Sequence, residues 1–158
     1  MRIFEFERST VVPASIEETF TFFSDAFNLE TITPPFLSFS VTTPAPIDIR
    51  EGCTIDYRLK LRGLPIRWRS LISAWDPPHR FVDEQLKGPY RMWHHEHTFA
   101  QHDEGTLVGD HVRYAVLGGA LVNRLFVRRD VEGIFDYREA KLREIFGGRT
   151  ATRHAAHR

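Results

Sequence analysis

Three of the eight histidines fall within one short segment of the chain. Residues 90–99 read Tyr-Arg-Met-Trp-His-His-Glu-His-Thr-Phe. Side chains of a strand alternate between two faces, and one face of this segment holds Trp93, His95, His97 and Phe99. Because Trp93 and Phe99 are strongly apolar, we expect this face to point inward, with both imidazoles directed toward the interior of the protein.

Two imidazoles in an apolar cavity can hydrogen-bond a ligand or transfer a proton near neutral pH. His95 and His97 are therefore candidate binding or catalytic residues. Two plainer interpretations stay open. The histidines can be structural groups with satisfied hydrogen bonds, or the strand can face the other way and leave them at the surface.

Asp110 is the third group with possible acid–base chemistry. It alternates with Val108 and Val112 on one face of the last predicted strand. The interpretation that we favour is an exposed ion pair at a sheet edge. In the alternative the carboxylate is buried, where it needs a partner, and His95 or His97 would complete an acid–base pair with it.

A metal site is a further possibility at the same histidines. His95 and His97 lie about 6.5–7 Å apart along a strand, and side chains of this length can reach one zinc ion. Asp110 or His111 would then add a ligand. No H-E-x-x-H motif or pair of cysteines is present, so we expect neither a metal nor another cofactor.

The elements that must position these residues follow from the hydrophobic pattern. A strand is predicted at 2–12, a helix from Ser15 in a capping box with Glu18, and a second short helix that ends at Thr33-Pro34-Pro35. Alternation then predicts antiparallel strands from Phe36 onward, the clearest of them at 54–62, 66–75, 80–87, 90–101 and 106–116.

One long helix is predicted at 120–146, where apolar residues recur every three or four positions. The glycines at 147–148 are expected to end it. Residues 149–158 have no apolar period, and we expect a flexible tail there. Residues 1–148 thus form one predicted domain.

Composition bounds the function. The chain has 158 residues, 42% of them hydrophobic and 13% aromatic, with 21 Lys and Arg against 21 Asp and Glu. A balanced charge argues against nucleic-acid binding. A single cysteine, Cys53, and the lack of a signal-like or 18-residue apolar segment predict a cytoplasmic protein without stable membrane insertion.

The order of the predicted elements and several local sequences resemble the START-like, or SRPBCC, superfamily. Residues 12–20 (VPASIEETF) are similar to the family's opening, where a strand passes into a helix through a proline and a small residue. Residues 22–35 resemble the segment that follows, and 105–106 (GT) with 112–114 (VRY) resemble the end of the last strand. The branch most resembled is that of stand-alone bacterial ligand-binding, cyclase/dehydrase-like proteins, over residues 2–146.

This resemblance implies an α+β helix-grip fold. A curved antiparallel sheet of about six or seven strands would wrap around the long C-terminal helix, with two short helices after the first strand. It also implies a cavity between sheet and helix for a hydrophobic small molecule. It implies no fixed catalytic set, because the superfamily mixes carriers, aromatase/cyclases, hydrolases and cochaperone-like domains.

The function expected from these observations is the binding of a small hydrophobic or aromatic molecule. The expected ligand-binding residues are Tyr57, Trp68, Trp93, His95, His97 and Tyr114. One alternative is a polyketide cyclase/aromatase-like enzyme that uses His95, His97 and Asp110 as acid–base groups. Another is a protein-interaction module whose groove takes an apolar segment of a partner. The oligomeric state stays open.

Overall fold

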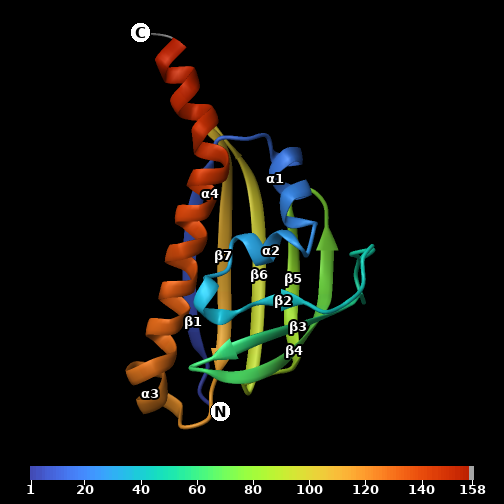
Figure 1. The fold of residues 1–158 in the computed structure, drawn as a ribbon, viewed down its shortest axis with the longest axis vertical. Coiled ribbons are helices and arrows are strands. Elements are labelled where there is room, and N and C mark those ends of the chain that lie inside the picture. Colours follow the sequence, from blue (N-terminus) through green and yellow to red (C-terminus); the bar gives the residue numbers. More distant parts are fainter. Residues whose placement is uncertain (157–158) are drawn as a thin grey trace.

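A curved, seven-stranded antiparallel sheet wraps around one long helix (Figure 1). The computed structural model describes the backbone of residues 1–156 and the side chains of residues 1–147. The strands are β1 (Phe4–Val12), β2 (Ser40–Val41), β3 (Thr54–Leu61), β4 (Leu64–Asp76), β5 (Arg80–Lys87), β6 (Met92–His102) and β7 (Gly105–Ala115). Their order across the sheet is β1-β7-β6-β5-β4-β3-β2, so the first strand pairs with the last. The predicted fold class is confirmed.

Helices fill the concave side of this sheet (Figure 1). They are α1 (Ile16–Phe23), α2 (Asn28–Thr31), the 3-10 turn η1 (Pro35–Leu37), and a C-terminal helix made of α3 (Gly119–Val122), the π-helical turn η2 (Asn123–Val127) and α4 (Arg128–Ala156). Ser15 caps α1 as predicted, because its Oγ accepts a 3.1 Å hydrogen bond from the backbone N–H of Glu18. No helix in the described chain is both long and apolar enough to cross a lipid bilayer.

The end of the long helix differs from the prediction. The structure carries α4 to Ala156, past the glycines at 147–148. Gly147 does not adopt the positive φ of a C-terminal helix cap, which is why it does not end the helix. The predicted flexible tail at 149–158 lies outside the residues whose side chains the structure describes, and it stays a prediction.

The β3–β4 hairpin also turns earlier than the sequence suggested. Arg62 and Gly63, with φ of 50° and 81°, form a two-residue turn, and β4 already begins at Leu64 rather than at residue 66. Strand β4 is also irregular in its middle, because the β4–β5 register shifts between Arg69 and Ser70 and again between Ile72 and Ala74.

Three separate apolar clusters join the helices to the sheet. Around α1, the rings of Phe20 and Phe99 lie 5.2 Å apart. At α4, the ring of Phe135 lies 5.0 Å from that of Phe6, and a third cluster around Ile55 covers β3 and β4. Residues from all three clusters line a cavity between the sheet and α4, so the core is hollow at its centre.

Candidate functional site

The cavity has a volume of about 160 Å³ and mostly apolar walls. Its residues come from strands β3 to β6 and from α1, α2, η1 and α4, and they include Ile55, Ile72, Trp75, Val131, Ile134 and Phe135. An apolar cavity of about 150 Å³ is large enough to hold benzene. The size and the walls therefore suit a small aromatic group.

The structure brings five of the six predicted ligand-binding residues to this cavity. Tyr57, Trp68, Trp93, His95 and His97 line it. Tyr114 does not: its side chain is fully buried in the cluster beside α4. The Tyr114 hydroxyl donates a 2.6 Å hydrogen bond to Asn123 Oδ1 in η2, so this tyrosine anchors the C-terminal helix to the sheet.

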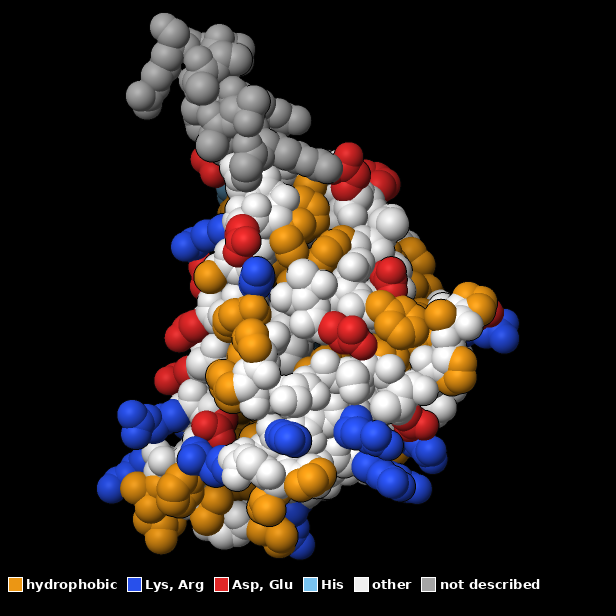
Figure 2. All heavy atoms as spheres, viewed as in Figure 1, with side chains coloured by type: hydrophobic (Ala, Val, Ile, Leu, Met, Phe, Trp, Pro, Cys, Tyr) orange, Lys and Arg blue, Asp and Glu red, His pale blue; other side chains and the backbone are white. Residues whose placement is uncertain are grey.

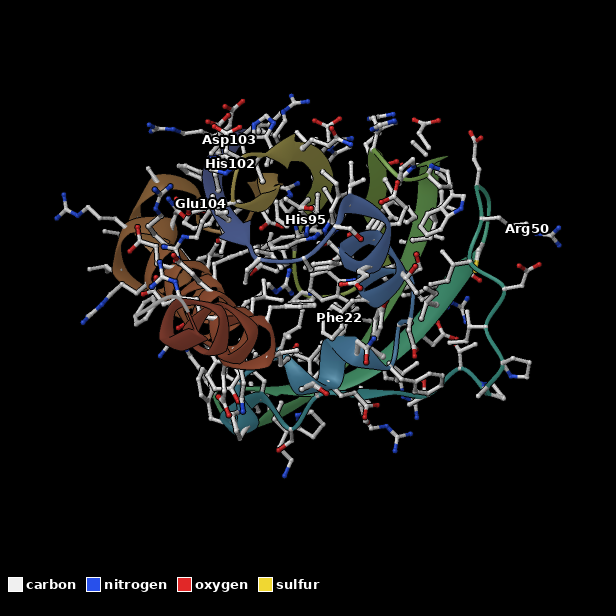
Figure 3. The ribbon with its side chains drawn as sticks, turned by 90° about the horizontal axis from the view of Figure 1, so that it is seen from above. Phe22, Arg50, His95, His102, Asp103 and Glu104 are labelled. Atoms are coloured by element: carbon white, nitrogen blue, oxygen red, sulfur yellow. The ribbon has the colours of Figure 1, made fainter. Side chains whose placement is uncertain are left out.

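His95 points inward, between the sheet and the helices (Figure 3), and His97, two residues further along β6, is buried on the same face. His95 and His97 are 4% and 3% exposed. Their rings stack with centroids 3.7 Å apart, and the ring of Phe81 stacks on the other side of His97 at 4.0 Å. This packing fixes the plane of each imidazole and leaves rotation about χ2 little room.

Each histidine is paired with its own carboxylate. His95 Nε2 lies 2.8 Å from Asp110 Oδ1, and His97 Nε2 lies 2.6 Å from Asp83 Oδ2. An ionised carboxylate only accepts hydrogen bonds, so Nε2 is the donor in both pairs. When the rings are neutral, the Nδ1 atoms are then acceptors, and Nδ1 of His97 has no hydrogen-bond partner among the described residues.

The favoured interpretation of Asp110 as an exposed edge residue is wrong. Its side chain is 8% exposed, because β7 lies between β1 and β6 inside the sheet. His111, the next residue, points to the outer face near Glu5 and Glu7. It therefore does not join the two inward histidines as a metal ligand.

Electrostatics favour ionised carboxylates and a neutral His97. Burial opposes ionisation of Asp110, but the hydrogen bond from His95 and the charges of His95 and Arg138 outweigh it and lower its pKa. The pKa of Asp83 is lowered in the same way, because its hydrogen bond with His97 and the nearby positive charges outweigh the opposing effect of burial. Burial, reinforced by the neighbouring His95, lowers the pKa of His97 to about 4, against the opposing effect of Asp83.

Arg138 of α4 completes the polar end of the cavity. It is 9% exposed, and its Nη1 lies 4.0 Å from Asp110 Oδ1, which is too far for a hydrogen bond. Within the described part of the chain, its Nε and Nη1 have no hydrogen-bond partner. Two buried N–H donors of a cation thus stand unused beside an apolar cavity.

Sequence reasoning missed Asp83 and Arg138, although both leave a signal. Asp83 shares a strand face with Phe81, two positions away, in the segment predicted as a strand. Arg138 falls three or four positions after Ile134 and Phe135 and four before Leu142. It therefore occupies a place on the apolar stripe where a charged residue is unexpected.

Ligand atoms of Asp83, His95 and His97 lie within 4.8 Å of one another, close enough to converge on a metal ion. The hydrogen bond between His97 and Asp83 already engages two of these groups. The guanidinium of Arg138 also adds positive charge nearby, which disfavours a second cation. The expected absence of a metal stays a prediction.

Comparison with known proteins identifies the fold. No protein-family model and no curated protein matches the chain. Among solved structures, protein Ms6760 from Mycobacterium smegmatis is 20% identical with a TM-score of 0.63, over 95% of this chain and 92% of that one. Ginseng major latex-like protein 151 from Panax ginseng is 12% identical with a TM-score of 0.63, over 87% and 96%.

A third solved structure belongs to a biosynthetic protein. The di-domain ARO/CYC protein StfQ from the steffimycin biosynthetic pathway is 15% identical with a TM-score of 0.71, over 94% of this chain and 52% of that one. Identities this low show a shared helix-grip fold and leave the activity open.

Proposed function

We propose that the protein binds a small apolar or aromatic molecule that carries a hydrogen-bonding oxygen atom. The observation that supports this is the pairing of apolar walls with unused polar groups at one end. Arg138 Nη1 and His97 Nδ1 lie 4.0 and 3.7 Å from the same oxygen, Asp110 Oδ1. A ligand hydroxyl in this region would accept from Arg138 and donate to His97.

Energetics support an oxygen at this position. A buried donor without a partner costs about 1–3 kcal/mol, and more when it is charged. A ligand that satisfies Arg138 therefore recovers free energy that a hydrocarbon of the same shape does not. Membership in the ligand-binding branch of the SRPBCC superfamily would agree with this proposal.

The test compares two ligands that differ in one oxygen, 4-ethylphenol and ethylbenzene. We expect Arg138→Met to weaken 4-ethylphenol about tenfold to a hundredfold, the cost of one lost buried hydrogen bond, and to leave ethylbenzene nearly unchanged. His95→Ala should weaken the phenol similarly, because it releases Asp110. Calorimetric titration, or the fluorescence of Trp68 and Trp93 in the cavity wall, measures both affinities.

Arg143→Met is the matched control, since Arg143 lies on the same helix with a side chain 71% exposed. It should change neither affinity. Equal weakening of both ligands by Arg138→Met would contradict the proposed role of the oxygen. Native mass spectrometry of freshly purified protein adds an independent view, because a resident ligand would appear as added mass.

A second candidate is an acid–base enzyme of the aromatase/cyclase kind, favoured by the two His–Asp pairs at the cavity. In this hypothesis Asp83 orients His97, and the bare Nδ1 removes a proton from a bound ketone while Arg138 stabilises the enolate oxygen. A pKa of about 4 for His97 makes it a weak base, because a general base works best with a pKa near the operating pH. We therefore prefer binding to catalysis.

Deuterium exchange separates the two candidates. Acetophenone incubated with the protein in D₂O should exchange its methyl protons no faster than in buffer if the protein is a binder. An accelerated exchange that disappears in His97→Gln would favour the enzyme. The third expectation, a protein-interaction module, stays a prediction; the cavity itself lies between the sheet and α4.

A further inference from the structure

The chain around α3 and η2 carries apolar side chains on both of its sides. Val122 and Val127 pack inward against the core. Leu121 and Leu125, four residues apart on this helix, are instead 64% and 47% exposed, and Leu117 in the turn before α3 is 69% exposed. An amphipathic helix of a globular protein ordinarily presents a polar face to solvent. Nothing among the described residues covers this apolar stripe.

Basic residues gather in the segments at the same end of the molecule. The segments 57–69, 86–93 and 112–129 together hold eleven of the 21 Lys and Arg residues and none of the 21 Asp and Glu residues. Figure 2 shows Lys and Arg together with exposed hydrophobic side chains at the lower end, and most Asp and Glu higher up. The protein has no net charge as a whole, but its positive charges gather at one end of the long axis of the molecule and most of its negative charges lie nearer the other end.

The tip of the β3–β4 hairpin lies beside the apolar stripe. The guanidinium carbon of Arg62 stands 5.0 Å from the ring centre of Phe126 in η2, and Leu64 at the tip is 67% exposed. The basal face is defined here as the apolar residues Leu64, Leu117, Leu121, Leu125 and Phe126 with the basic residues Lys60, Arg62, Arg91, Arg124 and Arg129.

We propose that the basal face docks reversibly on an anionic lipid surface. Exposed leucines flanked by arginines are the pattern by which peripheral proteins bind such surfaces, since apolar burial and attraction to anionic headgroups add together. Arg91, Arg124 and Arg129 form no ion pair with any described residue, so their charges are available. Arg62 is paired with Asp130.

Charge argues against a second copy of the chain as the occupant. A two-fold interface sets the same patch against itself, and here it would bring arginines against arginines. Lipid phosphates supply the opposite charge. The location also fits the cavity, because Leu61, Pro89 and Tyr90 belong to the basic segments and line the cavity as well. An apolar ligand would thus have a short path between a bilayer and the protein.

Vesicle co-sedimentation tests the proposal with lipids as the probe. We expect the protein to bind vesicles of phosphatidylglycerol and phosphatidylcholine in equal amounts, and not pure phosphatidylcholine, with binding weakened by added salt. The double substitution Leu121→Gln and Leu125→Gln should lower the partition constant at least about tenfold, because two exposed side chains lose their burial. Arg124→Gln with Arg129→Gln should lower it about tenfold on the anionic vesicles.

Phe36→Gln is the matched control, because Phe36 in η1 is 71% exposed and lies outside the basal face; it should bind like the parent protein. Absent binding, or equal binding to neutral vesicles, would overturn the proposal. A dimer that becomes monomeric in the double leucine variant would also overturn it, in favour of a second copy. Arg138→Met should keep vesicle binding, so this proposal and the cavity proposal can fail separately.

Discussion

Asparagine in place of Asp110 is expected to lower the free energy of unfolding by about 3–5 kcal/mol, the range for removing one partner of a buried ion pair. The carboxylate is 8% exposed, 2.8 Å from His95 Nε2 and 4.0 Å from Arg138 Nη1. An amide keeps the shape and removes the charge. Arg138 would then be a buried cation without its nearby anion. Urea unfolding followed by fluorescence measures the loss.

Asp56→Asn is the control, because Asp56 makes a hydrogen-bonded ion pair in an exposed place. Its two oxygens lie 2.7 and 3.3 Å from Arg69, and both side chains are about two-fifths exposed. Exposed pairs contribute about 0–1 kcal/mol, so this substitution should cost far less. Equal losses for the two variants would contradict the burial of Asp110.

Coupling to Arg138 can be measured directly. If Asp110 stabilises the guanidinium, Arg138→Met should cost less in the Asp110→Asn background than in the parent protein. The difference is the interaction free energy between the two residues. Strictly additive losses would mean that the 4.0 Å separation carries no net attraction.

Local pattern predicted the strands and the orientation of the site well. The apolar side chains of Trp93 and Phe99 favoured the face of β6 that is buried in the structure, although the opposite orientation stayed open, because a one-residue shift would move every side chain to the other face. The strand at 80–87 and the Ser15 cap follow from signals within a few residues. Five residues that line the cavity could be predicted from such local signals.

The remaining errors come from contacts between distant parts of the chain. Asp110 looked like an edge residue, because its burial depends on β1 pairing with β7 across about a hundred residues of sequence. Tyr114 points inward as expected, but the position of η2 directs it to Asn123 instead of the cavity. The place of Arg138 at the cavity could not be predicted, because it depends on where α4 crosses the sheet. Periodicity reports which face is buried, not which buried group it meets.

Acid is expected to destabilise the protein below about pH 6.5 through His97, which is held neutral by burial and by His95. The unfolded chain takes up a proton at the ordinary pKa of 6.5, whereas the folded protein does so only at about 4. The unfolded state therefore binds more protons in this window, so stability falls as the pH falls. A difference of this size corresponds to about 3 kcal/mol.

Urea unfolding between about pH 7 and about pH 4 measures this dependence. The groups around His97 are Asp83, Asp110, His95 and Arg138. Both carboxyls have a pKa lowered from the ordinary value of 3.8. The stability that they contribute is therefore lost only below that value, at lower pH than the loss caused by His97.

His97→Gln should remove most of the loss of stability between about pH 6.5 and 4, because no imidazole remains at that position to gain a proton on unfolding. His102→Gln, in the exposed β6–β7 hairpin, should keep it. A parent protein whose stability is flat across this window would contradict this prediction, because His97 would then take up its proton at the same pKa, near 6.5, in the folded and the unfolded states.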